Sequence, residues 1–373
     1  MMAAAPSSVA TDPPRILHVC DSIIGGTGSY LAELLTPQAA RYGAASLLLL
    51  MPRQHIDHIE PRLRDSGIAF AYFDRPNRLM GMVKLLLAYW TVRRRFRPDI
   101  VHAHSFGAGV STRIVHWSRR PAMLFCPHGW AFNMAVAPMV RRVIVAIERL
   151  LALRTDRILL ISGHERESAE AVGMPGDKLV TIPNAIAADP PAIAAATWDD
   201  PRIKLLFVGR FDRQKGLDLL IEAIRPLGHK YVLRVVGSPV VGKPADFGAP
   251  LDFVDFVGWR DRDGVSAEMK AADAVIVPSR WEGFGLVATE AMRLGKPVIA
   301  SDAGGLNDIL DHGRYGISFP AGDGVALREV LERIDADMLR SYGPRGHARF
   351  LAEYTTQRMV DQVDAVYREM LSE

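Results

Sequence analysis

Short apolar runs alternate with longer amphipathic segments over the first half of the chain. Such runs, bounded by turn residues, are typical of buried strands, and the segments between them have the spacing of amphipathic helices. Strands that alternate with helices predict parallel β-α-β units, because a parallel pair needs a crossover connection. The expected strands are Ile16–Cys20, Ser46–Leu50, Ile68–Phe73, Ile100–Ala103, Met123–Cys126, Ile158–Ile161 and Leu179–Ile182.

The alternation stops between Pro183 and Pro201, a stretch of prolines and alanines with weak periodicity, and then resumes. The later strands are expected at Ile203–Val208, Tyr231–Val236, Val254–Val257, Ala274–Val277, Val298–Ala300 and Gly316–Phe319. The pattern predicts an α/β protein with two doubly wound Rossmann-like domains that face each other across a ligand-binding cleft.

The expected domain bounds follow from this interruption. They are a disordered tail at residues 1–14, a first domain at 15–183, a linker at 184–201, a second domain at 202–344 and a C-terminal segment at 345–373. One amphipathic helical pattern runs from Arg345 to Met370, and we expect this helix to cross back to the first domain.

The composition is that of a globular protein with a full core: of 373 residues, 49% are hydrophobic and 23% are charged. Cys20 and Cys126 each end an apolar run, which favours buried thiols in a reducing compartment over a disulfide framework or a zinc site. Met1–Pro14 lacks the features of a signal peptide, and charges interrupt every long apolar run. We therefore expect a cytoplasmic protein.

The positive charge is concentrated in one region. Between Arg75 and Arg157 the chain has fifteen Lys and Arg residues and three acidic residues, whereas the net charge of the whole chain is only +3. The apolar segments 79–97 and 137–157 both carry arginines, a pattern typical of helices that lie on an anionic membrane surface. This predicts a protein bound peripherally to the inner face of the membrane. The alternative is that both helices pack on the first sheet and that their arginines are merely solvated.

Two carboxylates flank a glycine turn between Ser279 and Glu290. A strand precedes the turn and a helix is expected from Leu286 to Leu294, and a helix start after a glycine turn is a common anion-binding geometry. A carboxylate at such a place is expected to accept hydrogen bonds from neutral hydroxyls. We therefore expect Glu282 to bind sugar hydroxyls and Glu290 to bind a second diol, and a nucleotide-sugar offers both.

A basic loop follows the first strand of the second series. Arg210 and Lys215 flank this loop, where a diphosphate would meet a bidentate fork and a point charge together. In isolation, such a loop more often carries two solvated surface cations. The acidic segment that comes later in the chain favours the diphosphate site.

A glycine turn, Gly25-Gly26-Thr27-Gly28, follows the first strand and opens a helix, which again suits an anion. The dinucleotide fingerprint G-x-G-x-x-G needs a glycine at position 31, where the chain has Leu31, so an NAD site is disfavoured. A tight turn whose glycines only permit helix packing is the alternative.

Three histidines lie at or near the carboxyl ends of predicted strands. His128 follows the strand Met123–Cys126 and should lie at the edge of the cleft. His102 and His104 share one face of a strand by their spacing of two, but no third ligand follows them in the chain. We therefore expect no metal, assign His102 to packing and place His104 on the acceptor side of the cleft.

The ordered motifs of the second half resemble those of the retaining glycosyltransferases of family 4, which have the GT-B fold. The resemblance covers most of the chain and is strongest from Ile203 to Pro320. The matching stretches are Gly209-Arg210-Phe211 with Lys215-Gly216, Val236-Gly237, Phe256-Val257-Gly258, Pro278-Ser279 through Glu290-Ala291-Met292, and Gly295-Lys296-Pro297-Val298.

The resemblance implies a role for each matching residue. Arg210 and Lys215 would hold the donor diphosphate, Glu282 the donor sugar and Glu290 the ribose. The backbone amides of Gly283, Phe284, Gly285 and Leu286 would contribute at the helix start, with Ser238 and Arg260 near the base. In the first domain, the turn of Gly25, Gly26 and Thr27 would lie against the donor diphosphate and the acceptor, and His128 would contact the donor sugar.

These observations predict a retaining, metal-independent enzyme without a cofactor. It would move a hexose from UDP-hexose or GDP-hexose to a glycan or a polyprenyl-diphosphate-linked acceptor in cell-surface polysaccharide synthesis. One alternative is a sugar-nucleotide epimerase or hydrolase of the same fold. Another is a nucleic-acid-binding protein that uses the basic region, but it would leave the motifs of the second half without a role, so we expect no nucleic acid partner.

Overall fold

The computed structural model describes residues 13–116, 120–134, 136–239 and 251–373. The tail expected at residues 1–14 lies, up to residue 12, outside the described residues. Within the described residues, no helix combines the length and the apolar character that crossing a bilayer requires.

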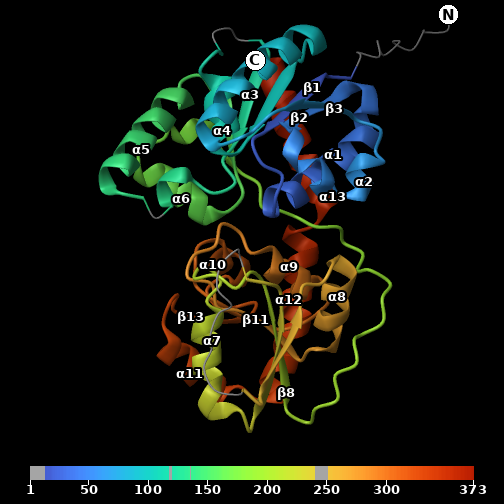
Figure 1. The fold of residues 1–373 in the computed structure, drawn as a ribbon, viewed down its shortest axis with the longest axis vertical. Coiled ribbons are helices and arrows are strands. Elements are labelled where there is room, and N and C mark those ends of the chain that lie inside the picture. Colours follow the sequence, from blue (N-terminus) through green and yellow to red (C-terminus); the bar gives the residue numbers. More distant parts are fainter. Residues whose placement is uncertain (1–12, 117–119, 135, 240–250) are drawn as a thin grey trace, which may run out of the picture. The chain divides into compact units, whose positions relative to one another are not determined.

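The first sheet has seven strands in the order β3-β2-β1-β4-β5-β6-β7, and the pairs that join β3 to β6 are parallel (Figure 1). The strands are β1 (Ile16–Cys20), β2 (Leu47–Pro52), β3 (Ala69–Phe73), β4 (Ile100–His104), β5 (Ala122–Cys126), β6 (Arg157–Leu160) and β7 (Leu179–Thr181). Every residue of β1, β4 and β5 is buried, which shows that helices cover both faces of this sheet.

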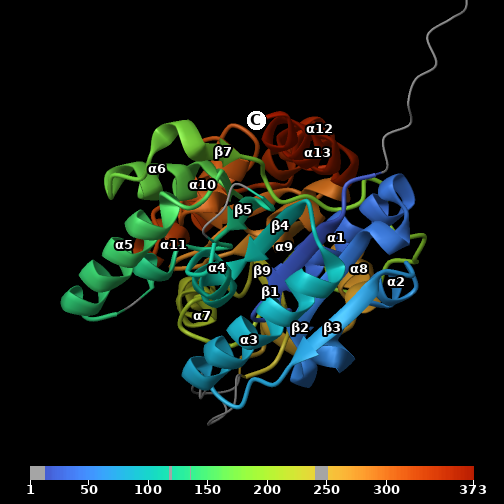
Figure 2. The same ribbon diagram turned by 90° about the horizontal axis from the view of Figure 1, so that it is seen from above.

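The helices around the first sheet come from both halves of the chain. They are α1 (Gly26–Tyr42), α2 (Pro61–Arg64), α3 (Arg78–Phe96), α4 (Ser105–Arg113), α5 (Pro138–Ala152), α6 (Gly163–Ala171) and α13 (Thr356–Ser372). Leu85 and Tyr89 of α3 pack with Val101 and Met123 on one face of the sheet. Figure 2 shows α3 and α4 on that face and α1 on the other.

The second sheet has six strands in the order β10-β9-β8-β11-β12-β13, all joined by parallel pairs. The strands are β8 (Ile203–Val208), β9 (Tyr231–Val236), β10 (Val254–Gly258), β11 (Ala274–Val277), β12 (Val298–Ser301) and β13 (Ile317–Phe319). The helices are α7 (Leu217–Ile224), α8 (Arg262–Ala271), α9 (Leu286–Arg293), α10 (Gly305–Leu310), α11 (Gly324–Arg333) and α12 (Ala336–Glu353). Numbered within each sheet, both strand orders begin 3-2-1-4-5-6, which is the Rossmann order.

The fold class expected from the sequence is confirmed: the protein is α/β with two doubly wound parallel sheets. Each strand expected from the hydrophobic pattern is present among the described residues, with ends that differ by at most two positions. The strands β8, β9 and β11 have the expected bounds.

The expectation of one continuous helix from Arg345 to Met370 is wrong. The chain forms two helices, α12 and α13, which are separated at Tyr354 and Thr355. There the extended residue Ile186 donates its N–H to the Tyr354 carbonyl at 3.0 Å and accepts from the Thr356 N–H at 3.0 Å. These two bonds replace helical ones, so the helical ladder is interrupted by a segment that lies far away in the sequence.

The contacts between residues divide the chain into two compact units. The first comprises Met1–Pro127, Met134–Leu159 and Asp364–Glu373, and the second comprises His128–Asn133 and Leu160–Val363. The short segment that begins at His128 therefore groups with the second unit, and the last ten residues group with the first. The domain bounds expected from the sequence stay a prediction, and each unit is described by itself below.

Candidate active site

The loop after β8 is held in place by two glycines. Gly216, at the start of α7, has φ +69°, and a Cβ at this position would lie 2.1 Å from the carbonyl oxygen of Pro278. Gly237, after β9, has φ +143°, and its Cβ would lie 1.9 Å from the carbonyl oxygen of Gly209. Only glycine permits these approaches, and they bring the loops that follow β8, β9 and β11 together.

Two predicted site residues form an ion pair between neighbouring loops. Lys215 Nζ lies 2.5 Å from Glu282 Oε2, and the two side chains are 19% and 13% exposed, respectively. Ser279 Oγ donates to the same carboxylate oxygen at 3.3 Å. The pair is largely sheltered from water, and the short contact holds the two side chains at a fixed position.

The same two loops are joined by further bonds. Gln214 Nε2 donates to the Trp281 carbonyl at 3.0 Å, and the Gln214 carbonyl accepts from the Arg280 N–H at 2.7 Å. The Arg280 guanidinium binds both carboxylate oxygens of Asp218, at 2.8 and 2.6 Å, and lowers the pKa of that carboxyl group. The loops therefore form one rigid surface at the carboxyl ends of β8 and β11.

Arg210 lies on this surface but is more accessible than Lys215. Its side chain is 59% exposed, and its Nη2 lies 3.2 Å from Asp212 Oδ2 and 3.1 Å from Gln214 Oε1. A guanidinium that is exposed to this extent can turn toward an incoming anion at little energetic cost, since its present ion pair is screened by water.

The turn that leads into α9 presents backbone groups. Gly285 is the N-cap of α9, with φ +112°, and no side chain caps this helix. Phe284 is buried, and the centroid of its ring lies 5.8 Å from that of Tyr354. This packing holds the turn in place. Leu286 is the first helical residue. The amides at this helix start thus have the geometry that binds an anion.

Glu290 lies on the fifth position of α9 and is half-buried. Ser238 and Arg260 are exposed, just beyond the ends of β9 and β10. The predicted donor residues of the second unit thus follow the strands β10, β9, β8 and β11, which are neighbours in the sheet order. The structure brings the predicted positions to one edge of one sheet.

His128 lies in a short loop that is held by a buried glutamate. Both carboxylate oxygens of Glu165, on α6, accept hydrogen bonds, one from the Gly129 N–H at 2.5 Å and one from the Ile161 N–H at 3.0 Å. The Glu165 carbonyl also accepts from Trp130 Nε1 at 2.9 Å. Glu165 thereby fixes the backbone on the carboxyl side of His128.

The protein environment shifts the pKa values of Glu165 and His128. Burial raises the pKa of Glu165 to about 7, although the hydrogen bonds from Ile161 and Gly129 act in the opposite direction. Desolvation lowers the pKa of His128 to about 3, although part of this side chain is exposed. The His128 ring is therefore neutral at pH 7, so it has one donor and one acceptor nitrogen for a sugar hydroxyl.

The predicted residues of the first unit lie at the start of α1. Gly25 and Gly26 are exposed, Thr27 is half-buried, and Gly25 is an N-cap without a side-chain cap. A Cβ at Gly28 would lie 2.1 Å from the Ile23 carbonyl oxygen, so this glycine is required by packing. His104, placed on the acceptor side from the sequence, is fully buried. Its acceptor role stays a prediction, and the structure gives its ring other partners.

Comparisons with known proteins agree with this geometry. Residues 191–342 match the family model of glycosyl transferases group 1, and residues 25–185 match that of the glycosyl transferase 4-like domain. An uncharacterized 41.2 kDa protein in the cps region of Klebsiella pneumoniae is 30% identical over 276 residues, which cover 70% of this chain and 76% of that protein. The chain belongs to the family-4 type of GT-B glycosyltransferases.

This glycosyltransferase is also similar to two proteins with more specific names. The phosphatidyl-myo-inositol mannosyltransferase of Mycobacterium leprae is 29% identical over 262 residues, covering 64% of this chain and 69% of that protein. HepE of Anabaena, solved in complex with UDP and glucose, has the same fold, with a TM-score of 0.77 and 19% identity over 95% of this chain and 100% of that chain.

Sequence reasoning missed three residues that build the site of this glycosyltransferase: Asp218, Arg280 and Glu165. The sequence Ser162-Gly163-His164-Glu165 has the S-x-x-E pattern of a capping box, which marks the start of a helix. Ser162 Oγ does accept from the Glu165 N–H at 3.2 Å. The Glu165 carboxylate, however, binds Gly129 and Ile161 instead of the capping residue, and no local pattern indicates that.

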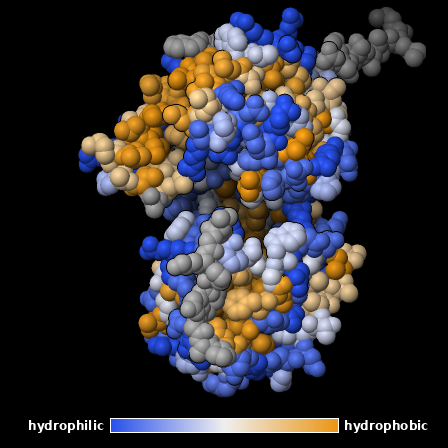
Figure 3. Space-filling view, viewed as in Figure 1, coloured by the Kyte–Doolittle hydropathy of each residue, from blue (hydrophilic) through white to orange (hydrophobic). Residues whose placement is uncertain are grey.

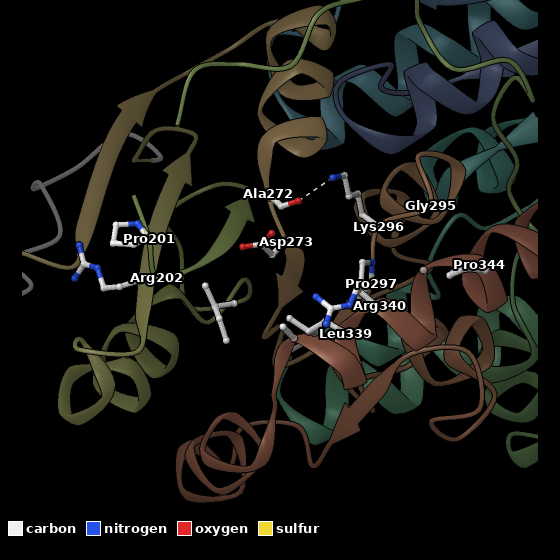
Figure 4. Close-up of a pocket in the computed structure, with 13 residues that line it drawn as sticks. Pro201, Arg202, Ala272, Asp273, Gly295, Lys296, Pro297, Leu339, Arg340 and Pro344 are labelled. Atoms are coloured by element: carbon white, nitrogen blue, oxygen red, sulfur yellow. Dashed lines mark hydrogen bonds between the residues drawn. The ribbon is translucent and has the colours of Figure 1, made fainter. Parts of the chain in front are cut away.

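A pocket of about 440 Å³ in the second unit, drawn in Figure 4, is lined by none of these residues. Its lining includes Ile203, Asp273 and Pro297, which lie at or just before the amino ends of β8, β11 and β12. Since ligands of open α/β sheets bind at the carboxyl ends of the strands, this pocket is not the donor site of the glycosyltransferase.

Proposed function

We propose that this glycosyltransferase moves a hexose from a UDP- or GDP-sugar to a glycan or polyprenyl-diphosphate-linked acceptor, with retention at the anomeric carbon. The observation that carries the proposal is the contact between Lys215 and Glu282 across two loops at the carboxyl ends of β8 and β11. A cation that would bind the diphosphate thus lies beside a carboxylate that would bind the sugar. The bond to be broken joins these two parts of the donor, so the two groups are expected to be neighbours.

The donor diphosphate would be held by Lys215, Arg210 and the amides that start α9. A charge-assisted hydrogen bond in a sheltered site contributes about 1.5–3 kcal/mol. As the bond between sugar and diphosphate breaks, negative charge grows on the leaving oxygen, and these fixed donors stabilise it more strongly than they stabilise the ground state. We propose that these groups carry the charge without a metal.

The hexose would be oriented by Glu282 and His128. The Glu282 carboxylate lies beside Lys215, and its oxygens would accept hydrogen bonds from sugar hydroxyls. The neutral His128 ring can donate to or accept from another hydroxyl. Glu290 would bind the ribose diol. We assign no covalent nucleophile: the departing diphosphate would accept the proton of the acceptor hydroxyl on the face that it leaves.

The known relatives guide the choice of substrates to test. HepE was solved with UDP and glucose, and the Klebsiella relative lies in a cps region. We therefore propose a role in polysaccharide synthesis and rank UDP-glucose first among the donors. The mannosyltransferase of Mycobacterium leprae makes GDP-mannose the second choice.

We also propose that the first unit binds peripherally to an anionic membrane, on its cytoplasmic face. The α5 segment has an exposed apolar side beside Arg141, Arg142 and Arg149, and Figure 3 shows a hydrophobic surface over it. The exposed apolar residues of this segment are Met139, Val140, Val143, Ile147, Leu150 and Leu153. A second exposed apolar group lies on α3, at Leu79, Met80, Val83, Leu87 and Trp90.

The experiment that tests the function is a transfer assay with purified protein, a panel of nucleotide-sugars and lipid-linked acceptors. We expect transfer with one donor class, and an anomeric proton coupling in the product that matches the donor. Inversion at this carbon would contradict the retaining mechanism. Rapid conversion of the donor without acceptor would instead identify an epimerase or a hydrolase.

A further inference from the structure

Three buried histidines meet on one face of the first sheet. His18 lies on β1, and His102 and His104 lie on the adjacent strand β4. His18 is directly opposite His102 in the register of the two parallel strands, and all three side chains point to the same face of the sheet. All three side chains are fully buried. The pairing of β1 with β4 thus brings His18 next to two histidines that lie more than eighty residues later in the chain.

The ring nitrogens are close enough to share one ion. His18 Nδ1 and His104 Nε2 are 3.1 Å apart, and one ligand nitrogen from each of the three rings lies within 4.8 Å of the others. Zinc binds imidazole nitrogen at about 2.0–2.1 Å, so two nitrogens on a tetrahedral ion are about 3.3 Å apart. A shift of a few tenths of an ångström would accommodate the ion between His18 and His104.

The groups around the cluster suit a metal site. His102 Nδ1 lies 2.8 Å from the hydroxyl of Tyr367 on α13, so an ion would be bound through the other ring nitrogen, Nε2. A hydrogen bond to the far nitrogen fixes the orientation of most metal-binding histidines.

We propose that His18, His102 and His104 form a structural site for a divalent transition metal, with zinc as the preferred ion. Imidazole ligands suit Zn²⁺, Ni²⁺ and Cu²⁺ far better than Mg²⁺ or Ca²⁺. The ion would join β1, β4 and, through Tyr367, the C-terminal helix α13. The proposal concerns the stability of the fold and assigns the ion no step in the proposed transfer chemistry.

This proposal departs from the expectation, drawn from the sequence, that no metal binds. That expectation rested on the absence of a third ligand near His102 and His104 in the chain. The third ligand is His18, which the register of the sheet supplies from a neighbouring strand.

The test is the metal content of the full-length chain, produced without a polyhistidine tag and measured by mass spectrometry of the elements. Because the rings are buried, metal is first removed with a chelator in denaturant, and the chain is then refolded with ZnCl₂. We expect about one zinc per chain in the wild type. His18→Gln should lower this content at least tenfold, whereas His229→Gln, at an exposed histidine of the second unit, should leave it unchanged.

Refolding with CoCl₂ keeps the test decisive if the His18 variant does not fold. We expect the wild type to give the intense visible absorption of tetrahedral cobalt and an X-ray absorption spectrum with imidazole ligands. A wild type that retains no zinc and shows no such absorption overturns the proposal. A His18→Gln variant that folds and keeps the full zinc content overturns it as well.

Discussion

The ion pair between Lys215 and Glu282 determines how single substitutions in the candidate site affect activity and stability. Both side chains are largely sheltered, so removal of one partner leaves an uncompensated charge. A loss of activity in an alanine variant could therefore result from impaired catalysis or from a less stable fold. Substitutions that keep the shape of the side chain separate the two effects.

We expect Glu282→Gln to lower kcat about 10²–10³-fold, because an amide binds sugar hydroxyls less strongly than a carboxylate and no longer pairs with Lys215. Steady-state transfer kinetics measure this change. Glu222→Gln is the matched control, since Glu222 pairs with Arg225 at 2.9 Å on an exposed helix surface. Equal activity of the Glu282 variant and the control would remove Glu282 from the site.

Glu165 is expected to act on activity through the loop of His128. Glu165→Ala removes both hydrogen bonds to the backbone of Gly129 and Ile161, and we expect kcat to fall about tenfold or more. Glu165→Gln keeps one acceptor oxygen and should fall between this variant and the wild type. If Glu165→Ala folds and transfers sugar at the wild-type rate, Glu165 has no positioning role.

The raised pKa of Glu165 also makes stability depend on pH. Its pKa is about 7 in the folded protein and 4.5 without perturbation, so protonation favours the folded state. This contribution is fully present below pH 4.5 and is lost as the pH rises through 7, a change of up to about 3 kcal/mol. Urea unfolding at pH 5 and pH 8 should therefore show a smaller advantage of the wild type over Glu165→Gln at the higher pH.

At the residue scale, the sequence allowed roles to be predicted for Lys215 and Glu282, but not their contact. Their motifs are local, whereas the contact depends on the adjacency of β8 and β11. The role of Glu165 was not predictable, because its partner Gly129 is supplied by a different part of the chain. His18 was missed for the same reason.

Helices differ in how they begin. The helices α1, α7, α9 and α10 start from a glycine without a side-chain cap. The helices α3, α6, α8, α11 and α12 start from Asn77, Ser162, Asp261, Asp323 and Asp335, whose side chains accept from the first turn. The glycine starts of α1, α7, α9 and α10 follow the central strands β1, β8, β11 and β12, where a ligand can take the place of the cap.

Two neighbouring glycines test the start of α9. Gly285 has φ +112°, and an added Cβ would lie 2.5 Å from Leu306 Cδ2, so Gly285→Ala should cost about 2–4 kcal/mol of folding free energy. Gly283 has no atom within 4 Å of an added Cβ, so Gly283→Ala should keep the stability of the wild type. Urea unfolding measures both. If Gly285→Ala were as stable as Gly283→Ala, this account of the turn would be wrong.

The exposed face of α5 is expected to decide membrane binding. Val143→Glu with Leu150→Glu should lower binding to vesicles that contain phosphatidylglycerol at least tenfold, because burial of each apolar side chain contributes about 1.5–3 kcal/mol. Co-sedimentation with vesicles measures this. Val325→Glu, at an exposed valine on α11, is the control and should bind like the wild type. Unchanged sedimentation of the double variant would contradict the assignment.

At the element scale, the strands were predictable because a buried parallel strand is a nearly continuous apolar run, as in β1 and β11. The break between α12 and α13 was not, since the helical pattern continues through Tyr354 and only pairing with Ile186 interrupts it. Local periodicity cannot reveal a competing partner from elsewhere in the chain.

The chain as a whole does not fold as two successive segments, because its last ten residues complete the first unit. Tyr367 is fully buried and bonded to His102, and Asp364 pairs with Arg41. Arg157 binds Glu369 at 2.6 Å. The first unit is therefore incomplete until residues 364–373 have been synthesised.

Removal of residues 364–373 should destabilise the first unit in particular. Loss of the buried Tyr367 side chain alone is expected to cost about 3–5 kcal/mol. Hydrogen exchange measured by mass spectrometry should show faster exchange in β1 and β4, whereas β8 and β11 should keep their protection. Equal loss of protection in both sheets would show that the two units unfold together.

The Lys215–Glu282 contact has a consequence for the end of the reaction cycle. The carboxylate and the nucleoside diphosphate compete for the same ammonium group, and the carboxylate is tethered beside it. After the hexose has departed, Glu282 has no sugar hydroxyls left to bind and can form the ion pair with Lys215 again. If the roles proposed for Lys215 and Glu282 hold, the carboxylate would replace the spent nucleotide at Lys215 and so favour product release over product inhibition.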